Sequence, residues 1–363
     1  MKILSELEYI DTNRNSLIEY ATSGSVLNNL GKINFINDRP KDTTIPFQFA
    51  EITLNLKNAT IIYPNILVSE KNDIINVNNG HTSIEKIRHN LEEFPLFIEN
   101  NTLVLKKPRK QFRIKECVYL TARPNYSAFL LGEIPRIRKY LKLIQSGIPI
   151  VLHGECMKFH LEFFKILGFD STKIIHVPRD TLIITSNLYH STPTFFHHSV
   201  TFGAIDFIRK NIKTNVDYKF NSNIYLSRSK LGSNADRHLT NEKNLEEFFR
   251  NQNFSIIHPE DLNILEQINI FRSAKILIAP FGATWANSIF RGQNTCSLML
   301  STKYTPEFSR IFQYLGVDLS VLNLIPVKGR EEKNISKSYN FNVEENEFEM
   351  LNRYLKHINT DEI

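Results

Sequence analysis

The spacing of apolar and polar residues changes along the chain. Residues 50–68, "AEITLNLKNATIIYPNILV", alternate apolar and polar side chains, which is the pattern of a half-buried β-strand. Beyond residue 120, segments with helical spacing alternate with short apolar segments, and this alternation is typical of an α/β layered fold. We therefore expect a β-rich leader over residues 1–120 and an α/β domain over residues 121–215.

Within that domain, residues 128–147 are expected to form a helix that Pro135 interrupts, because proline lacks the backbone N–H a helix needs. A second helix is expected over residues 156–169. The apolar segments predict strands at 148–154, 173–177 and 181–186. Residues 191–222 contain a helix between polar stretches, which indicates a connection to the next domain.

The second half of the chain has the most regular pattern. Residues 223–229 are expected to form a strand that ends in a polar turn. Further strands are expected at 254–260, 275–280 and 296–300, and helices at 241–252, 263–274 and 306–316. Residues 276–279 are apolar without alternation, as a parallel strand covered on both faces requires. Residues 216–327 therefore predict a Rossmann-like domain. A tail over 328–363 contains an amphipathic helix with Phe348, Leu351, Tyr354 and Leu355 on one face.

Composition narrows the class of protein. The three cysteines, Cys117, Cys156 and Cys296, lie far apart without metal-ligand spacing, so neither a disulfide framework nor a zinc site is predicted. No signal peptide and no membrane-spanning run is recognised, which favours a reduced, cytoplasmic setting. The net charge of +6 suits an anionic partner.

The basic residues are densest from Lys106 to Lys115, "KKPRKQFRIK". A solvated edge strand, protected from aggregation by its charges, is the favoured interpretation. Contact with an anionic membrane surface or an acidic substrate is the alternative, and no nucleic-acid partner is expected because nothing nearby resembles a nucleic-acid-binding fold.

Three loops of the predicted parallel sheet carry polar residues, and ligands bind outside the carboxyl ends of such strands. Arg228, directly after a strand, presents a planar fork of donors to a diphosphate or is a surface arginine. In "RHLTNE", Asn241 or Thr240 is expected to cap the next helix, and Glu242 in its first turn interacts favourably with the helix dipole. These roles do not involve Arg237, which is therefore the better ligand candidate.

The third loop lies in "ILIAPFGATWANSIF", residues 276–290. Gly282 and Ala283 are small, so the backbone can approach a ligand, and their N–H groups lie at a predicted helix N-terminus that favours anions. Nucleotide-binding, esterase and zinc-protease motifs are all missing, and no Asp-x-Asp occurs to hold a metal diphosphate. A diphosphate site built from arginines and a helix N-terminus is therefore predicted.

The ordered set "YLSRS", Arg237, "NE", "FSIIHPEDLNILEQ" and "ILIAPFGATWANSIF" resembles glycosyltransferase family 61. Members show Tyr-x-Ser-Arg, Arg…Asn-Glu, a strand ending Pro-Glu, a helix with Glu-Gln and the turn Gly-Pro-His-Gly-Ala-Gly. "ARPNYSAFLLGEIPRI" is similar to the family's Asn-Tyr-Tyr-His-(Trp/Phe)-Leu-Leu-Asp-x-Leu-Pro-Arg segment. The likeness covers roughly residues 55–325.

This resemblance implies a GT-B architecture, with a nucleotide-sugar donor in residues 216–327 and an acceptor facing residues 121–215. It implies an inverting transferase without metal or other cofactor, acting on a glycan or lipid-linked glycan acceptor. The implied role is the synthesis of a bacterial capsule or surface polysaccharide at the cytoplasmic face of the membrane.

By motif position, the resemblance also implies the site residues. The acceptor side is assigned Asn125, Tyr126 and Arg136. The donor side is assigned Arg228, Ser229, Arg237, Asn241, Glu242, Pro259, Glu266, Gln267, Pro280, Phe281, Gly282, Ala283 and Asn287.

The chain departs from the family at three polar positions, where it has Ala128, Gly132 and Phe281. An inverting reaction needs a base for the acceptor hydroxyl. Glu133 is the first candidate, although a solvated helix residue is an equally good interpretation, and His153 is the second. Two alternative functions therefore stay open. The protein could bind a nucleotide sugar or a polysaccharide without catalysis, or it could be an epimerase that acts on the nucleotide sugar.

Overall fold

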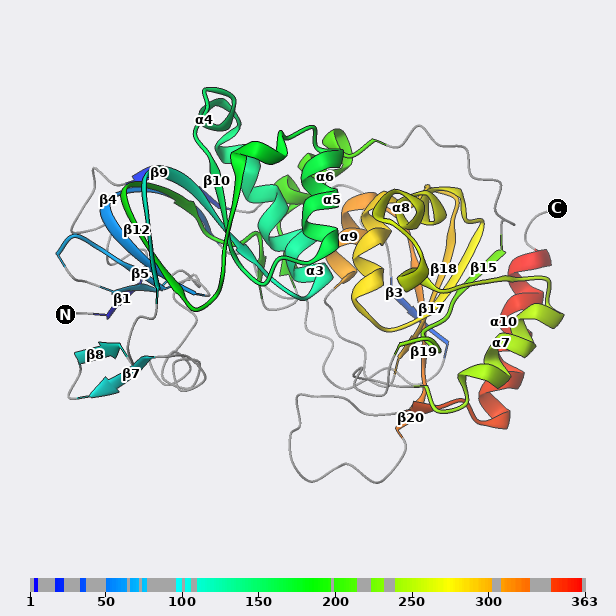
Figure 1. The fold of residues 1–363 in the computed structure, drawn as a ribbon. Helices are drawn as coiled ribbons and strands as arrows, with labels where there is room; N and C mark the ends of the chain where they lie inside the picture. Colours follow the sequence, from blue (N-terminus) through cyan, green and yellow to red (C-terminus); the bar gives the residue numbers. More distant parts are fainter. Residues whose placement is uncertain are drawn as a thin grey trace. The chain divides into compact units, whose positions relative to one another are not determined.

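The computed structural model describes residues 3–5, 17–22, 33–36, 50–63, 66–71, 74–76, 96–99, 102–105, 110–196, 199–213, 223–231, 239–301, 308–326 and 341–360 (Figure 1). The chain divides into two units. Unit 1 contains residues 1–25 and 47–212, and unit 2 contains residues 26–46 and 213–363. Both units combine a β-sheet with helices, so the fold is α/β as expected, while the GT-B arrangement stays a prediction.

Unit 1 is built on one nine-stranded mixed sheet. The strands β9 (Lys110–Ala122), β10 (Ile150–Gly154), β11 (Ile174–Val177) and β12 (Thr181–Ser191) run parallel. The antiparallel part contains β4 (Ala50–Ile62), which pairs with β12, and β5 (Ile66–Val68). The sheet is completed by β6 (Ile74–Asn76), β1 (Ile3–Ser5) and β2 (Leu17–Thr22).

The helices of unit 1 follow the sequence pattern closely. The segment around Pro135 changes its helix type three times, through α3 (Tyr126–Ala128), a π-helical turn (Phe129–Glu133), a 3₁₀ helix (Ile134–Lys139) and α4 (Leu141–Gln145). A missing proline N–H accounts for the break in regular α-helix. The other helices that the structure describes in unit 1 are α5 (Lys158–Ile166), a 3₁₀ turn (Ser171–Lys173) and α6 (Phe202–Asn211).

Two hairpins complete the strands of unit 1. One joins β7 (Leu96–Glu99) to β8 (Thr102–Leu105), and the other joins β13 (Phe195–Phe196) to β14 (Ser199–Val200).

Unit 2 contains a six-stranded sheet in which all strands are parallel. Its order is β16 (Ser255–Ile257), β15 (Asn223–Leu226), β17 (Ile276–Pro280), β18 (Cys296–Ser301), β19 (Leu319–Asn323) and β3 (Ile33–Phe35). The central strand β17 is buried along its whole length, which explains its unbroken apolar run.

Helices connect these strands, as the Rossmann-like prediction requires. They are α7 (Glu242–Asn251), a 3₁₀ turn (Pro259–Asp261), α8 (Ile264–Ser273), a 3₁₀ helix (Ala283–Phe290) and α9 (Ser309–Leu315). The predicted tail helix is α10 (Glu345–Thr360), which packs against α7 (Figure 1). Leu351 and Leu355 of α10 lie in the core of unit 2, and its Phe348 ring lies 5.3 Å from Phe248.

The four-part division expected from the sequence stays a prediction. In the structure, strands from residues 1–120 share one sheet with β10, β11 and β12, and residues 26–46 belong to unit 2. Residues 26–46 belong to unit 2 because β3 pairs with β19, a strand that lies almost 300 residues later in the sequence (Ile33 pairs with Leu319). The tail is likewise joined to unit 2, where β21 (Phe341–Asn342) pairs with β20 (Ile325–Pro326).

The helices of the described residues are all too short or too polar to cross a bilayer.

Candidate functional site

Two of the predicted donor loops meet in unit 2. Arg228 lies two residues after the end of β15 and Gly282 lies two residues after the end of β17, and these strands are neighbours in the sheet. The Arg228 guanidinium donates through Nη1 to the carbonyl oxygen of Phe281 at 2.8 Å. It lies so close to Gly282 that a Cβ atom there would be 3.2 Å from Nη1. The structure therefore brings the arginine and the glycine turn together at the carboxyl end of the strands.

Two buried glutamates of α7 support this loop from behind. Glu242 Oε1 accepts from the Arg228 N–H at 2.5 Å, from the Ser227 hydroxyl at 3.1 Å and from the Tyr225 hydroxyl at 3.1 Å. Burial raises the pKa of Glu242, although these donors oppose the shift. The predicted donor residue Glu242 is thus placed to orient the loop of Arg228.

Glu246, one helical turn after Glu242, completes the support. Its Oε1 accepts from the Ser227 hydroxyl at 2.7 Å and from the Ser229 hydroxyl at 2.6 Å, and its Oε2 accepts from Arg250. Sequence reasoning missed Glu246 because only apolar residues were used to find the inner face of the helix. The available signal was its spacing of four residues from Glu242, which places both on one face.

The turn after β17 is anchored by side chains rather than opened to solvent. The Phe281 ring is buried and lies 5.9 Å from the ring of Phe308. The Trp285 indole donates to the carbonyl oxygen of Pro280 at 3.1 Å and is itself buried. Phe281, where the family has histidine, thus contributes a core side chain and a carbonyl oxygen that holds Arg228.

Asn287 and Gln267 form a cross-link between the turn and α8. The buried Asn287 donates to Gln267 Oε1 at 3.3 Å, and Gln267 Nε2 donates to the carbonyl oxygen of Pro259 at 2.9 Å. Glu266 forms a capping box with Asn263 at the start of α8. Pro259, Gln267 and Asn287 are therefore brought together, and Ala283 begins the 3₁₀ helix beside them.

The remaining donor candidates lie differently from the expectation. Asn241 does occupy the N-cap position of α7, but the predicted side-chain cap is wrong, since no capping hydrogen bond forms. Its amide instead clamps the backbone of Val343, donating to the carbonyl oxygen at 2.9 Å and accepting from the N–H at 3.1 Å. Arg237 lies outside the described residues.

In unit 1, Glu133 is fully buried, so its interpretation as a solvated helix residue is wrong. Its carboxylate pairs with Arg123 Nε at 3.0 Å and with Arg136 Nη1, and it accepts from the Thr121 N–H at 3.1 Å. Burial opposes ionisation, but the two arginines keep the pKa of Glu133 below its usual value. A carboxylate held in this way is ionised, and the low pKa reduces its strength as a base.

Arg136 has no exposed surface and is bound on all sides. Besides Glu133, its guanidinium donates to the carbonyl oxygen of Tyr119 at 3.1 Å and to His190 Nδ1 at 2.9 Å. Burial and the Arg136 charge hold the pKa of His190 well below its usual value, so the ring is neutral. This placement suits a residue that positions Glu133 better than one that contacts an acceptor from solvent.

His153, the second base candidate, is the last residue but one of β10 and is buried between Tyr63 and Tyr119. Its Nδ1 lies 3.3 Å from the Tyr119 hydroxyl. Burial lowers its pKa to about 4. The ring is neutral near pH 7 and able to accept a proton, but weakly basic.

Gly132 is one of the positions at which the chain departs from the family resemblance. A Cβ atom there would lie 3.5 Å from Phe195 Cβ, which is ordinary van der Waals contact. Asn125 is exposed and caps α3 by accepting from the Ala128 N–H at 3.0 Å. Tyr126 packs 5.5 Å from the ring of Phe159. Asn125 is thus the acceptor candidate that solvent reaches.

Arg123 is the residue of unit 1 that sequence reasoning missed. It directly follows β9, and Arg228 lies two residues after the end of β15, so a similar signal was present in "LTAR". Its side chain is one-third exposed and ion-paired with the buried Glu133. Across the described part of the chain no group of three or more His, Cys, Asp or Glu side chains is arranged to hold a metal.

The comparisons with known proteins agree with the predicted family. The profile of the family named Glycosyltransferase 61 matches residues 80–298, a range that includes every predicted site residue. No curated protein matches the chain in sequence. Because the profile covers more than half of the chain, the protein belongs to glycosyltransferase family 61 and is a glycosyltransferase.

Proposed function

We propose that unit 2 binds the diphosphate of a nucleotide-sugar donor at the Arg228–Gly282 pair. The observation that carries this proposal is the meeting of an arginine and a glycine turn at the carboxyl ends of two adjacent parallel strands. Ligands bind at this edge of open parallel sheets, and arginine matches the geometry of phosphate oxygens.

The site is also preorganised for that task. Phe281 holds the guanidinium through its carbonyl oxygen, and Glu242 holds the backbone of Arg228. A side chain that is already oriented loses less conformational entropy when it binds a ligand. The proposed donor residues are therefore Arg228, Ser229, Gly282 and Ala283, with Glu242, Glu246, Gln267 and Asn287 in support.

For the reaction, we propose inverting transfer to a hydroxyl group of a glycan acceptor without a metal ion. The Arg228 charge would stabilise the departing diphosphate. Glu133 and His153 remain the candidates for the base, and Asn125 and Tyr126 for acceptor contact. The role we propose is bacterial surface or capsule polysaccharide synthesis at the cytoplasmic face of a membrane, as the family resemblance implies.

A binding protein without catalysis is the second candidate, favoured by one observation. At position 281, where the family resemblance implies a histidine, the chain has a buried Phe281 ring that lies 5.9 Å from the ring of Phe308. A binding-only protein would retain affinity for the donor but would neither transfer nor hydrolyse its sugar.

A panel of UDP-, GDP- and TDP-sugars, with CMP-sugars as the comparison that carries one phosphate, tests both candidates. One of them is expected to raise the melting temperature, since a ligand that binds only the folded state stabilises it. That donor is then incubated with the protein and glycan acceptors, and release of the free nucleotide is measured. Binding without release supports the second candidate, and no stabilisation by any member contradicts the donor site.

A further inference from the structure

Three adjacent strands of unit 1 change their side-chain alternation at the same level. In a regular strand every second residue faces the core. In each of these strands, one interval between core-facing residues is one residue longer than regular alternation allows. The interval lies between Leu56 and Ala59 in β4, between Ile114 and Cys117 in β9, and between Ile183 and Leu188 in β12. An additional outward-facing side chain is inserted into each strand at this level.

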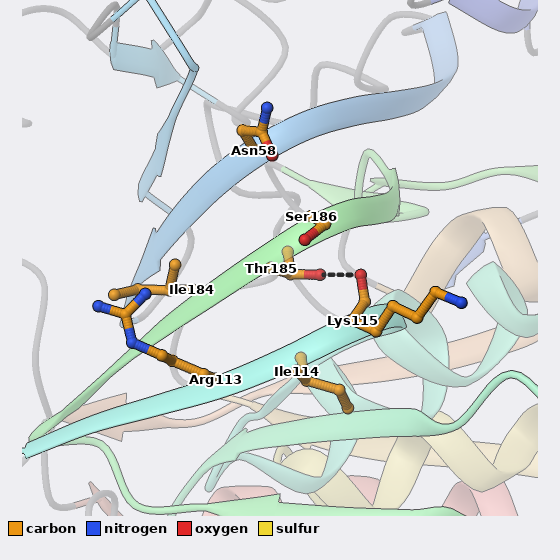
Figure 2. Close-up of a pocket in the computed structure, with 7 residues that line it drawn as sticks. All are labelled: Asn58, Arg113, Ile114, Lys115, Ile184, Thr185 and Ser186. Carbon is orange, nitrogen blue, oxygen red and sulfur yellow. Dashed lines mark hydrogen bonds between the residues drawn. The ribbon is translucent and has the colours of Figure 1, made fainter.

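The inserted residues form a row of Asn58, Ser186 and Lys115. Register pairs join Thr185 to Ala59 and to Ile114 on one side of the row, and Asn187 to Lys57 and to Glu116 on the other. Asn58 takes the left-handed conformation, with φ of 48°. The Thr185 hydroxyl donates to the carbonyl oxygen of Lys115 at 3.3 Å (Figure 2). The same hydroxyl accepts from the Asn187 N–H at 3.2 Å.

A pocket of about 420 Å³ lies at this row (Figure 2). Its volume falls within the range of small-molecule sites, roughly 300–1,000 Å³. Polar, apolar and cationic side chains from three strands line it: Asn58, Arg113, Ile114, Lys115, Ile184, Thr185 and Ser186.

The charged side chains of the lining are both cationic. Arg113 and Lys115 are exposed, and Arg113 Nη2 donates to Gln111 Oε1 at 3.1 Å. Among the described residues, Lys115 Nζ forms no ion pair. Two carboxylates lie nearby without lining the pocket: Glu70 accepts from Asn58 Nδ2 at 2.9 Å, and Glu116 is the neighbour of Lys115 in β9.

We propose that this pocket binds an anionic sugar residue of a glycan chain. Arg113 and Lys115 would pair with its carboxylate or phosphate, while Ser186 and Asn58 offer hydrogen bonds to hydroxyl groups. Ile184, opposite Arg113 in the register, supplies an apolar contact for the ring. A concave pocket that mixes these groups fits a discrete sugar better than a flat bilayer surface.

The pocket is separate from the strand-end residues of unit 1. Lys115 precedes Ala122, the end of β9, by seven residues, which corresponds to about 23 Å along an extended strand. The inference rests on the proposed function, because a glycan acceptor is what an additional sugar-binding pocket would hold. It deepens that function by giving the acceptor an acidic character.

Calorimetric titration of the full chain with tetragalacturonate tests the proposal. Arg113→Ala/Lys115→Ala removes the cations, and Ser186→Trp fills the pocket while keeping them. Lys158→Ala/Lys210→Ala is the matched control, since it removes the same charge from exposed helix positions of unit 1. Maltotetraose, inorganic phosphate and phosphatidylglycerol vesicles serve as the uncharged, anion-only and membrane probes.

We expect tetragalacturonate to bind the wild type at least tenfold more tightly than either pocket variant, and the control variant to bind as the wild type does. Maltotetraose should bind more weakly than tetragalacturonate, and inorganic phosphate should compete with it. No binding to the wild type, equal weakening in the control, or a preference for the vesicles would each overturn the proposal. Nucleotide binding should be equal in all variants, so a failed donor site would be seen separately.

Discussion

The guanidinium of Arg228 lies directly over Gly282, held there by a hydrogen bond to the carbonyl oxygen of Phe281. Any side chain at position 282 would begin 3.2 Å from Arg228 Nη1, closer than most Cβ atoms approach a neighbour. The backbone of Gly282 is extended, with φ of 179°, so its conformation is open to any residue. The glycine therefore leaves space to the arginine, whose guanidinium would have to shift by a few tenths of an ångström to admit a Cβ atom.

Gly282→Ala should displace the Arg228 side chain and weaken binding of the donor diphosphate. A shifted charge-assisted hydrogen bond corresponds to roughly 1–2 kcal/mol, or about tenfold in Kd. Titration calorimetry with the matching nucleoside diphosphate measures the effect. Gly292→Ala is the control, because a Cβ atom there would meet its nearest atom at 3.4 Å. Equal affinity of the two variants would contradict the proposed contact.

Glu133→Gln should destabilise unit 1 and lower turnover far more than donor affinity. Replacing one member of a buried ion pair leaves the Arg136 charge without its partner, which costs about 3–5 kcal/mol. Urea unfolding measures the stability, and steady-state kinetics at a temperature where the variant is folded measures turnover. A stable variant with near-normal turnover would exclude Glu133 both as the base and as a support of the site.

The buried histidines should make the protein sensitive to mild acid. The unfolded chain protonates His153 near its ordinary pKa of 6.5, whereas the folded state does so only near pH 4. The free energy of unfolding should therefore fall as the pH drops from 6.5 to 4, by about 3 kcal/mol for this one residue. His190 acts in the same direction, and the paired Glu133 adds a further loss below about pH 4.5.

Urea unfolding at pH 7 and pH 5 checks this sign. His153→Gln should show a smaller loss of stability between the two pH values than the wild type, although it can be less stable at both. An unchanged difference would mean that His153 does not titrate as its burial requires.

Transferase activity should survive treatment with EDTA, because the proposal assigns the neutralisation of the diphosphate to Arg228 rather than to a metal ion. Initial rates with and without EDTA, and after addition of Mg²⁺, measure this directly. A strict requirement for a divalent ion would contradict metal-independent transfer.

The parallel sheet of unit 2 could be predicted from the sequence because its signals are local. Strand β17 is an unbroken apolar run, and α8 has its apolar residues on one face. The membership of residues 26–46 could not be predicted, since it depends on β3, a strand of three residues that pairs with β19 near the other end of the chain.

The candidate site likewise contains residues that the sequence predicted and residues whose environment it did not predict. Arg228 and Gly282 were found because each follows a predicted strand, and the topology brings such loops to one edge. The burial of Glu133 was missed, since a charge within a helical segment is normally on its polar face. Its environment is set by Arg123 at the end of a strand and by Arg136 one turn later, which only the folded chain brings together.

The most direct test of the account is the affinity of the Arg228→Ala variant for the nucleoside diphosphate of the donor that stabilises the wild type. Loss of this charged contact should weaken binding by about 1.5–3 kcal/mol, which is tenfold or more in Kd. Arg353→Ala, which removes an exposed arginine from α10, should bind as the wild type does. An unchanged Kd in a folded Arg228→Ala variant would contradict the donor site proposed for unit 2.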